Sequence, residues 1–128
     1  MLNIPNLDNI SSIFILSGAG IDAESGIKTF RASDGLWEGH DVTAVAHPDG
    51  FAKDRDLVYS FYNERRKQLL SPATKPNAAH YALADLEKHY QVDIVTQNIS
   101  DLQQRAGSTS IIQMHGSLIE ARCLSENN

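Results

Sequence analysis

The chain has 128 residues, enough for one domain that buries roughly two thirds of the surface of its unfolded chain. Its formal net charge is −5, and residues 1–50 contain two basic residues against seven acidic ones, which argues against a basic face for nucleic-acid binding. No Lys or Arg precedes Lys28, and the apolar run at 13–16 is too short for a signal peptide or a membrane span, so we expect a soluble, cytoplasmic protein without a membrane partner.

Short apolar strands alternate with helices along the chain. The run at 13–17 predicts a strand, 19–25 predicts a helix, and 27–50 predicts a loop. The remaining expected elements are helices at 54–70 and 77–89, a strand at 92–96, a short helix at 101–105 and a strand at 111–114. Glycine and proline residues separate these segments. The alternation indicates an α/β fold with a parallel sheet whose faces are covered by helices.

The first expected strand runs into a glycine-rich turn. Gly18, Gly20 and Ala23 fit the pattern G-x-G-x-x-G/A, in which small residues allow a tight turn, close approach of the backbone to a pyrophosphate and packing of the next helix. The free amides of that helix would then face the phosphates. An ordinary turn at a strand exit also fits this pattern, so the pattern alone leaves both interpretations open.

The segment after this turn differs from an ordinary dinucleotide-binding fold. That fold places an acidic residue about 20 residues further on, at the end of a second strand. Glu38 and Asp41 have this spacing, but the residues before them are too polar and glycine-rich to predict a strand. We expect instead a long loop that carries Phe30, Arg31 and Trp37, and loops of this length are usually functional.

The helix expected at 54–70 has a charge inside its apolar stripe. The residues of this stripe follow helical spacing: Val58, Phe61, Tyr62, Arg65 and Leu69. Arg65 therefore lies apart from the wet face of Glu64, Arg66 and Lys67, and a charge there needs a partner. One interpretation is an internal ion pair, or a side chain that reaches past its neighbours to water. The other is that Tyr62 and Arg65, one turn apart, present a hydroxyl and a guanidinium to a carboxylate on a ligand.

One histidine lies where catalytic groups often gather. His115 follows the strand expected at 111–114, and strand exits carry the catalytic groups of many α/β folds. An imidazole there can accept a proton near neutral pH. The other four histidines match no motif, and we expect them in loops or on helix surfaces: His40, His47, His80 and His89.

Three separated blocks of the sequence carry a family signature. The first block is Gly18-Ala19-Gly20-Ile21-x-Ala23-Glu24-Ser25-Gly26-Ile27-x-Thr29-Phe30-Arg31 with Gly35-Leu36-Trp37, the second is Thr96-Gln97-Asn98-Ile99 with Leu102 and Arg105-Ala106-Gly107, and the third is His115-Gly116. In order and spacing they closely resemble the sirtuins, which are NAD-dependent protein deacylases. Residues 61–66 resemble the bacterial, class III branch.

The resemblance covers nearly the whole chain but only about the first half of a sirtuin catalytic domain. It implies that residues 1–128 are a partial catalytic domain. This truncated domain would keep the Rossmann-like NAD-binding part and lack most of the zinc module and the C-terminal strands.

The resemblance also implies a reaction and its partners. In sirtuins the oxygen of an acyl-lysine attacks the nicotinamide ribose, nicotinamide leaves, and a ribose hydroxyl activated by a His attacks the imidate. The products are free lysine, nicotinamide and O-acyl-ADP-ribose. His115 would be this general base, the partners would be acylated-lysine proteins, and Tyr62 with Arg65 would select acidic acyl groups such as succinyl, malonyl or glutaryl.

The cofactor residues follow from the same resemblance. The implied NAD-binding residues are Gly18, Ala19, Gly20, Ile21, Ala23, Glu24, Phe30, Arg31, Trp37, Gln97, Asn98, Ile99 and Ser100. Among them, Gln97 and Asn98 would place the ribose and the nicotinamide, while Phe30 and Arg31 would cover the reacting centre.

The chain departs from the family signature at three positions. Ser100 stands where the family usually has an Asp that contacts the nicotinamide carboxamide, and Gln103 stands where a His usually follows Leu102. Asp22 stands where the signature usually has Ser. A carboxylate beside a pyrophosphate should weaken NAD binding, by about 1 kcal/mol at contact in water. Alternatively Asp22 points outward as a first-turn helix residue, where acids are favourable.

Zinc and the missing strands bear on what this chain can do alone. Cys123 matches the first zinc ligand of the family, but structural zinc takes four ligands and Cys123 is the one cysteine, so we do not expect zinc on this chain. An unpaired sheet edge could associate with another chain. Three functions stay open: a deacylase (deacetylase or desuccinylase), a non-catalytic NAD-binding remnant or partner-dependent half-domain, and an NAD hydrolase.

Overall fold

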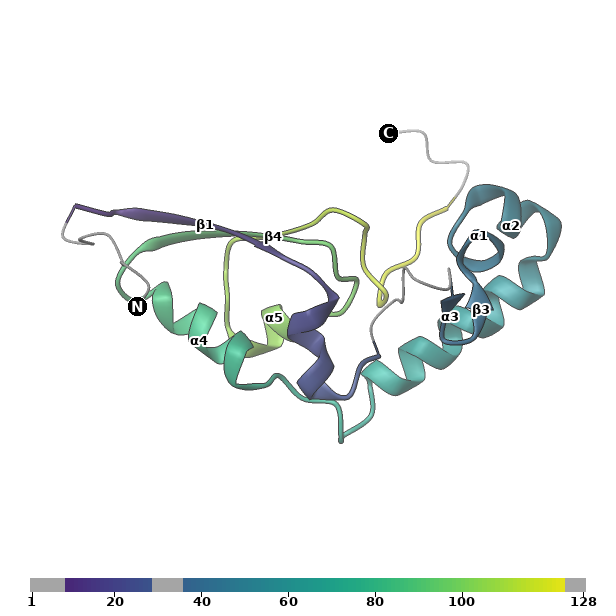
Figure 1. The fold of residues 1–128 in the computed structure, drawn as a ribbon, viewed down its shortest axis with the longest axis horizontal. Coiled ribbons are helices and arrows are strands. Elements are labelled where there is room, and N and C mark those ends of the chain that lie inside the picture. Colours follow the sequence, from purple (N-terminus) through teal and green to yellow (C-terminus); the bar gives the residue numbers. More distant parts are fainter. Residues whose placement is uncertain (1–8, 29–35, 124–128) are drawn as a thin grey trace.

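A parallel sheet forms the centre of the molecule in the computed structural model, which describes residues 9–28 and 36–123 (Figure 1). Its three strands are β1 (Ser12–Ser17), β4 (Gln91–Thr96) and β5 (Ile111–Gln113), in the order β1-β4-β5. Both pairings are parallel, and Ser17 lies opposite Thr96 where β1 and β4 end. The predicted α/β fold with a parallel sheet is therefore confirmed, and the segments that follow β1 and β4 begin side by side.

Helices cover one face of this sheet. The 3₁₀ helix η1 (Ala19–Ser25), α4 (Ala78–Leu86) and α5 (Leu102–Ala106) lie on the same side of the strands (Figure 1). On the opposite face Phe14, Leu16 and Ile112 are 69%, 64% and 63% exposed. The expectation that both faces are covered is therefore wrong for the described part of the chain, because no described helix lies over that second face.

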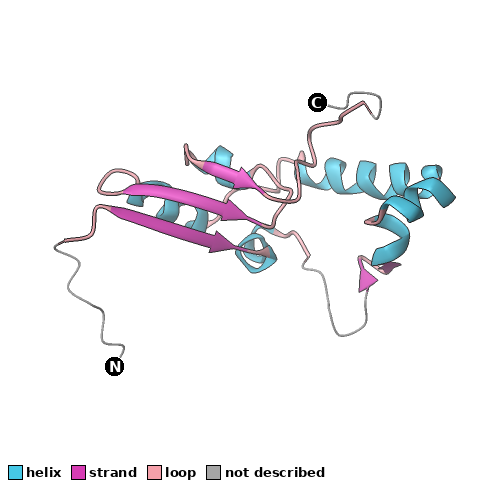
Figure 2. Ribbon diagram, turned by 90° about the horizontal axis from the view of Figure 1, so that it is seen from above, coloured by secondary structure: helices cyan, strands magenta, loops and turns pink. Residues whose placement is uncertain are grey.

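A second group of elements lies beyond the carboxyl ends of the strands, toward which the strand arrows point (Figure 2). It consists of the hairpin β2 (Leu36–Trp37) and β3 (His40–Asp41), followed by α1 (Val42–Val45), α2 (Pro48–Lys53) and α3 (Arg55–Leu69). The loop predicted for 27–50 is thus wrong over much of its length. Strands of two residues and a helix of four are too short to produce a periodic apolar pattern.

The two longest helices have side-chain caps at their N-termini. Asp54 Oδ1 accepts a hydrogen bond from the Leu57 amide and starts α3, and Asn77 Oδ1 accepts one from Ala79 and starts α4. The predicted helices at 54–70 and 77–89 are confirmed, although α4 ends three residues early, at Leu86, because residues 87–89 form a turn. No described helix is long and apolar enough to cross a membrane, and the cytoplasmic location stays a prediction.

A small apolar core joins the sheet to the second group. Leu69 of α3, Leu102 of α5 and Leu118 are buried together, with Tyr62 and Ile99 packed against them. Each fully buried leucine contributes about 1.5–3 kcal/mol. Arg66 strengthens this junction, since its Nε donates to the Leu118 carbonyl at 2.9 Å rather than lying on the wet face of α3 as expected.

Candidate functional site

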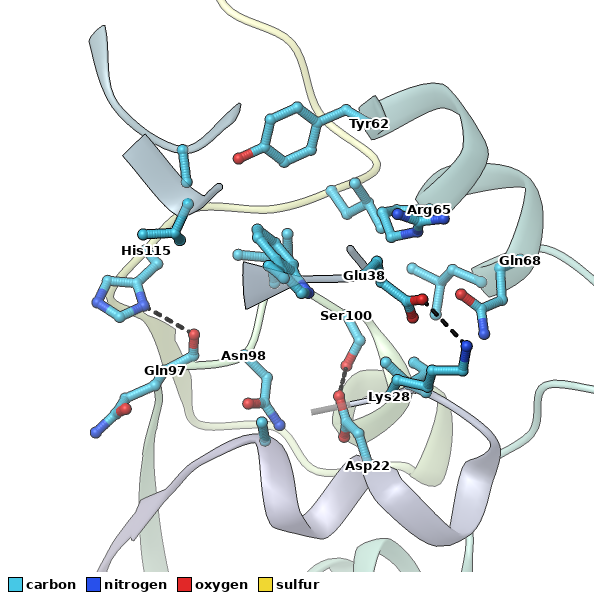
Figure 3. Close-up of a pocket in the computed structure, with 18 residues that line it drawn as sticks. Asp22, Lys28, Glu38, Tyr62, Arg65, Gln68, Gln97, Asn98, Ser100 and His115 are labelled. Carbon is cyan, nitrogen blue, oxygen red and sulfur yellow. Dashed lines mark hydrogen bonds and ion pairs between the residues drawn. The ribbon is translucent and has the colours of Figure 1, made fainter. Parts of the chain in front are cut away.

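A cavity of about 590 Å³ opens where η1, α3 and the segments after β4 and β5 meet (Figure 3). Nine of the residues predicted for the site line it: Ala19, Trp37, Tyr62, Arg65, Gln97, Asn98, Ile99, Ser100 and His115. Gly18 caps η1, while Gly20, Ile21, Ala23 and Glu24 lie within it. Phe30 and Arg31 fall outside the described residues. The structure thus gathers side chains from five separate segments into one cavity.

The glycine turn at the start of η1 leaves space that the described residues do not fill. Gly18 is extended, with φ −139° and ψ −171°, and supplies no side-chain cap to the helix. A Cβ on Gly18 would have Gln97 Oε1 as its nearest neighbour at 3.9 Å, and a Cβ on Gly20 would meet nothing within 4 Å. The turn therefore has room among the described residues for close approach of another group to its backbone.

Hydrogen bonds fix the segment after β4 against this turn. Asn98 Nδ2 donates to the Gly18 carbonyl at 3.1 Å, and the Asn98 amide donates to Thr96 Oγ1 at 3.1 Å. From the other side Gln113 Nε2 donates to the Ser100 carbonyl at 2.8 Å. The parallel register of β1 and β4 is what makes these contacts available, because both strands end at the same edge of the sheet.

The His115 ring is oriented by a backbone carbonyl. Its Nδ1 lies 2.9 Å from the carbonyl oxygen of Gln97, and His115 itself is exposed at the cavity (Figure 3). A carbonyl oxygen can only accept, so Nδ1 carries the proton of the neutral ring. Nε2 is then free to accept a proton from a ligand, which is the chemical requirement for a general base.

Arg65 is held in place but incompletely paired. Its side chain is 17% exposed, its guanidinium carbon lies 4.8 Å from the centre of the Phe61 ring, and Nη2 lies 3.3 Å from Glu64 Oε2. Nε and Nη1 are buried and have no hydrogen-bond partner in the described part of the chain. Beside Arg65, burial raises the pKa of Tyr62, so its hydroxyl remains a donor. The ion pair with Glu64 thus accounts for one guanidinium nitrogen, and the other two have no hydrogen-bond partner among the described residues.

The side chain of Asp22 is buried and hydrogen-bonded. It is 4% exposed and accepts hydrogen bonds from Ser100 Oγ at 2.7 Å and from His80 Nε2 at 3.0 Å. The expectation that Asp22 could point outward is therefore wrong. His80, expected on a helix surface, is 1% exposed, because as the third residue of α4 it faces η1. Asn77 three residues earlier is a helix-cap signal that would have placed His80 in the first turn.

An ion pair at the cavity was not predicted from any sequence pattern. Lys28 Nζ lies 3.3 Å from Glu38 Oε2, and both residues line the cavity (Figure 3). No group of three or more His, Cys, Asp or Glu residues suited to a metal ion occurs among the described residues, where Cys123 is exposed. The ion pair of Lys28 and Glu38 adds to the hydrogen bonds that Asn98 and His115 make at the cavity.

Comparisons with known proteins place this arrangement in a family. Residues 18–128 match the model of the Sir2 family. The chain is 56% identical over 119 residues to an NAD-dependent protein deacylase of Helicobacter pylori, covering 93% of this chain and 51% of that protein. To an NAD-dependent protein deacylase of Pasteurella multocida it is 60% identical over 114 residues, covering 88% and 49%. The chain thus spans about half the length of the curated relatives it matches.

Solved structures show the same likeness. A Sir2 homologue in complex with NAD superimposes with a TM-score of 0.80 at 44% identity, over 92% of this chain and 45% of that one. A Sir2 structure with 2′-O-acetyl-ADP-ribose and a deacetylated p53 peptide gives 0.66 at 36% identity, over 84% and 40%.

Proposed function

The chain belongs to the Sir2 family, and we propose that its cavity is the NAD site of a protein-lysine deacylase. The reaction would remove an acyl group from lysine and form nicotinamide and O-acyl-ADP-ribose. Relatives that carry the name NAD-dependent protein deacylase, and a Sir2 homologue in complex with NAD, support this proposal.

The residues of the cavity fit this cofactor. The turn at Gly18 and Gly20 has room for a group that approaches the backbone, and the first amides of η1 have no side-chain cap. Gln97 and Asn98 lie beside the turn and would orient the ribose and the nicotinamide. Bound NAD would supply an electrophilic ribose carbon and a ribose hydroxyl.

His115 would act as the general base. With Nδ1 held by the Gln97 carbonyl, its Nε2 would accept the proton of a hydroxyl at the cavity. The 2.9 Å contact between His115 Nδ1 and the Gln97 carbonyl, in a cavity that Ala19 of the glycine turn also lines, is the observation that carries the proposal.

The acyl group would be acidic. Arg65 has two buried nitrogens without a partner in the described residues, and Tyr62 lies one helical turn away with a protonated hydroxyl. A guanidinium fork with a neighbouring hydroxyl matches a carboxylate, so we propose succinyl-lysine, or malonyl- or glutaryl-lysine, as the preferred substrate class.

The test is product formation by the whole chain. The protein is incubated with NAD and a succinylated peptide, and O-succinyl-ADP-ribose is measured by mass spectrometry. His115→Ala should lower the rate by about 10²–10⁴-fold, the range of general-base catalysis, and leave NAD binding intact. Absence of product at high protein concentration would contradict the catalytic proposal, and NAD consumption without peptide would instead indicate an NAD hydrolase.

A second candidate is an NAD-binding unit that acts with another polypeptide. The exposed apolar face at Phe14, Leu16 and Ile112, and the outer strands β1 and β5 of the described sheet, favour association through this sheet. NAD binding without turnover, restored to activity by a co-purifying protein, would support this candidate.

Zinc is a separate question. Family resemblance assigns Cys123 to zinc, and structural zinc takes four ligands. We propose that this chain binds NAD without structural zinc, and metal analysis of the purified protein tests this.

A further inference from the structure

A buried carboxylate at the cavity is held on both of its oxygens. Ser100 Oγ lies 2.7 Å from Asp22 Oδ2, and His80 Nε2 lies 3.0 Å from Asp22 Oδ1. The three side chains come from η1, from α4 and from the segment after β4, and Asp22 rises from η1 toward Ser100 (Figure 3). Contacts from two other segments therefore fix the orientation of this carboxylate.

The hydrogen-bond directions leave Asp22 as an acceptor. The backbone amide of Asn77 donates to His80 Nδ1 at 3.2 Å, so the proton of the neutral His80 ring lies on Nε2 and is donated to Asp22. Ser100 has a hydroxyl proton and donates the second bond. An ionised carboxylate offers about four acceptor positions, so roughly two remain for a group that enters the cavity.

Within residues 9–28 and 36–123, no Lys or Arg pairs with Asp22 at those positions. Lys28, which lines the same cavity, is paired with Glu38. A carboxylate that lacks a cationic partner at a cavity wall is suited to a ligand with N–H donors or positive charge.

Asp22 and Ser100 are also two of the positions at which this chain departs from the sirtuin signature. The signature usually has Ser at position 22 and Asp at position 100, and this chain has the reverse. The 2.7 Å hydrogen bond between the two side chains turns these departures into one exchange. Relative to the signature, the carboxylate is at position 22 and the hydroxyl is at position 100, so the cavity still contains one group of each kind.

We propose that Asp22 binds the nicotinamide carboxamide of NAD in this chain, with Ser100 and His80 as the positioning residues that hold its carboxylate. This inference rests on the proposed NAD site. A carboxamide has two N–H donors, and the nicotinamide ring of oxidised NAD is positively charged, so both features match a carboxylate. Asp22 then strengthens NAD binding, opposite in sign to the weakening that like charge near a pyrophosphate would cause.

The test compares two ligands that differ by the nicotinamide. NAD and ADP-ribose are titrated into the full chain by calorimetry, and ADP-ribose reports on the nucleotide site and on folding. Asp22→Ser should weaken NAD binding by about tenfold or more, the effect of losing one or two hydrogen bonds to a charged group, and leave ADP-ribose binding within about threefold. Asp22→Asn keeps the shape of the side chain and should also lose NAD affinity selectively.

The decisive variants are the single and double exchanges. Ser100→Asp alone replaces the hydroxyl that donates to Asp22 by a second carboxylate, and the repulsion between the two carboxylates should weaken NAD binding. The double variant Asp22→Ser with Ser100→Asp should recover NAD affinity to within about threefold of the unmodified chain, because the carboxylate returns on the other side of the contact.

Two results would overturn the inference while leaving the NAD site standing. One is an equal loss of NAD and ADP-ribose affinity in Asp22→Ser, which would assign Asp22 a structural role. The other is a double variant that binds NAD no better than the weaker single variant. If the unmodified chain binds neither ligand, the proposed function fails and this inference fails with it.

Discussion

Arg65 shows what the surroundings of one residue can reveal about a ligand. The Phe61 ring and Glu64 hold its guanidinium, but Glu64 is exposed, and an ion pair of that kind contributes about 0–1 kcal/mol. Two of its nitrogens are buried without a partner in the described residues, which is costly unless a ligand supplies an acceptor. The carboxylate of the proposed acidic acyl group would supply such an acceptor.

Replacing Arg65 by Met should therefore change acyl selectivity. We expect kcat/KM on a succinylated peptide to fall by roughly 10²-fold, since two hydrogen bonds to a charged group are lost, while kcat/KM on the matched acetylated peptide stays within about threefold. Because burial raises the pKa of Tyr62 above 10.0, the preference for succinyl should persist from about pH 7 to pH 9. Equal losses on both peptides would contradict the assignment.

The sequence predicted that Arg65 lies in the apolar stripe of its helix, but it did not predict the buried contacts of Asp22. One physical reason explains both outcomes. Helical spacing is local, so it placed Arg65 in the stripe of α3 with Phe61 and Leu69. The partners of Asp22 are distant in sequence: His80 is 58 residues away and Ser100 is 78 residues away. Periodicity indicates which face of an element is buried, and it carries no information on what lies against that face.

At the scale of elements, Asn77 both starts α4 and attaches it to η1. Its Oδ1 accepts from the Ala79 amide at 2.9 Å, while its Nδ2 donates to the Ile21 carbonyl at 2.7 Å and to Ser25 Oγ at 3.0 Å. The two helices are thus held together at the point where Asp22 meets His80. The geometry of the cavity depends on this junction as well as on the strands.

Asn77→Ala should consequently cost more stability than the loss of a cap alone. Asp54 is a matched control, because its side chain caps α3 through Leu57 and makes no other hydrogen bond in the described structure. We expect about 1 kcal/mol for Asp54→Ala and about 2–3 kcal/mol for Asn77→Ala, measured by urea unfolding. Asn77→Asp keeps the cap but loses the Nδ2 donors, so its cost should lie between these values. Equal costs for the two alanine variants would show that the junction contributes nothing.

The helices and strands that were predicted correctly are those with a clear local pattern of apolar residues. The predicted helix at 54–70 rests on the repeating apolar stripe of α3, and the predicted strand at 92–96 rests on the short, mostly apolar segment of β4. The hairpin of β2 and β3 has no such repeat. Helix α2 did have a signal, since Pro48 occupies its first turn, where proline is favoured.

At the scale of the whole molecule, the two faces of the sheet differ. Parallel register places Leu16, Val95 and Ile112 in one row across the strands, and Leu16 and Ile112 in that row are exposed. The neighbouring row points to the helices and contains Ile94, which is 1% exposed. The four consecutive apolar residues 13–16 of β1 predict burial on both faces, whereas Asp93 of β4, which pairs with Phe14, is a polar residue on the open face.

This difference predicts that substitutions on the open face change the free energy of unfolding little, whereas substitutions on the covered face lower it strongly. Phe14→Thr with Leu16→Thr introduces β-branched residues, which suit a strand, and should change the free energy of unfolding by no more than about 0.5 kcal/mol, as for surface positions. The same double variant should bind less of the dye ANS and self-associate less in light scattering, because the apolar patch becomes smaller. Ile94→Ala on the covered face should cost about 2–5 kcal/mol through cavity formation. If the Phe14 and Leu16 variant instead loses as much stability as Ile94→Ala, this face is packed against another surface in solution. That result would support the candidate function in which the chain acts with another polypeptide.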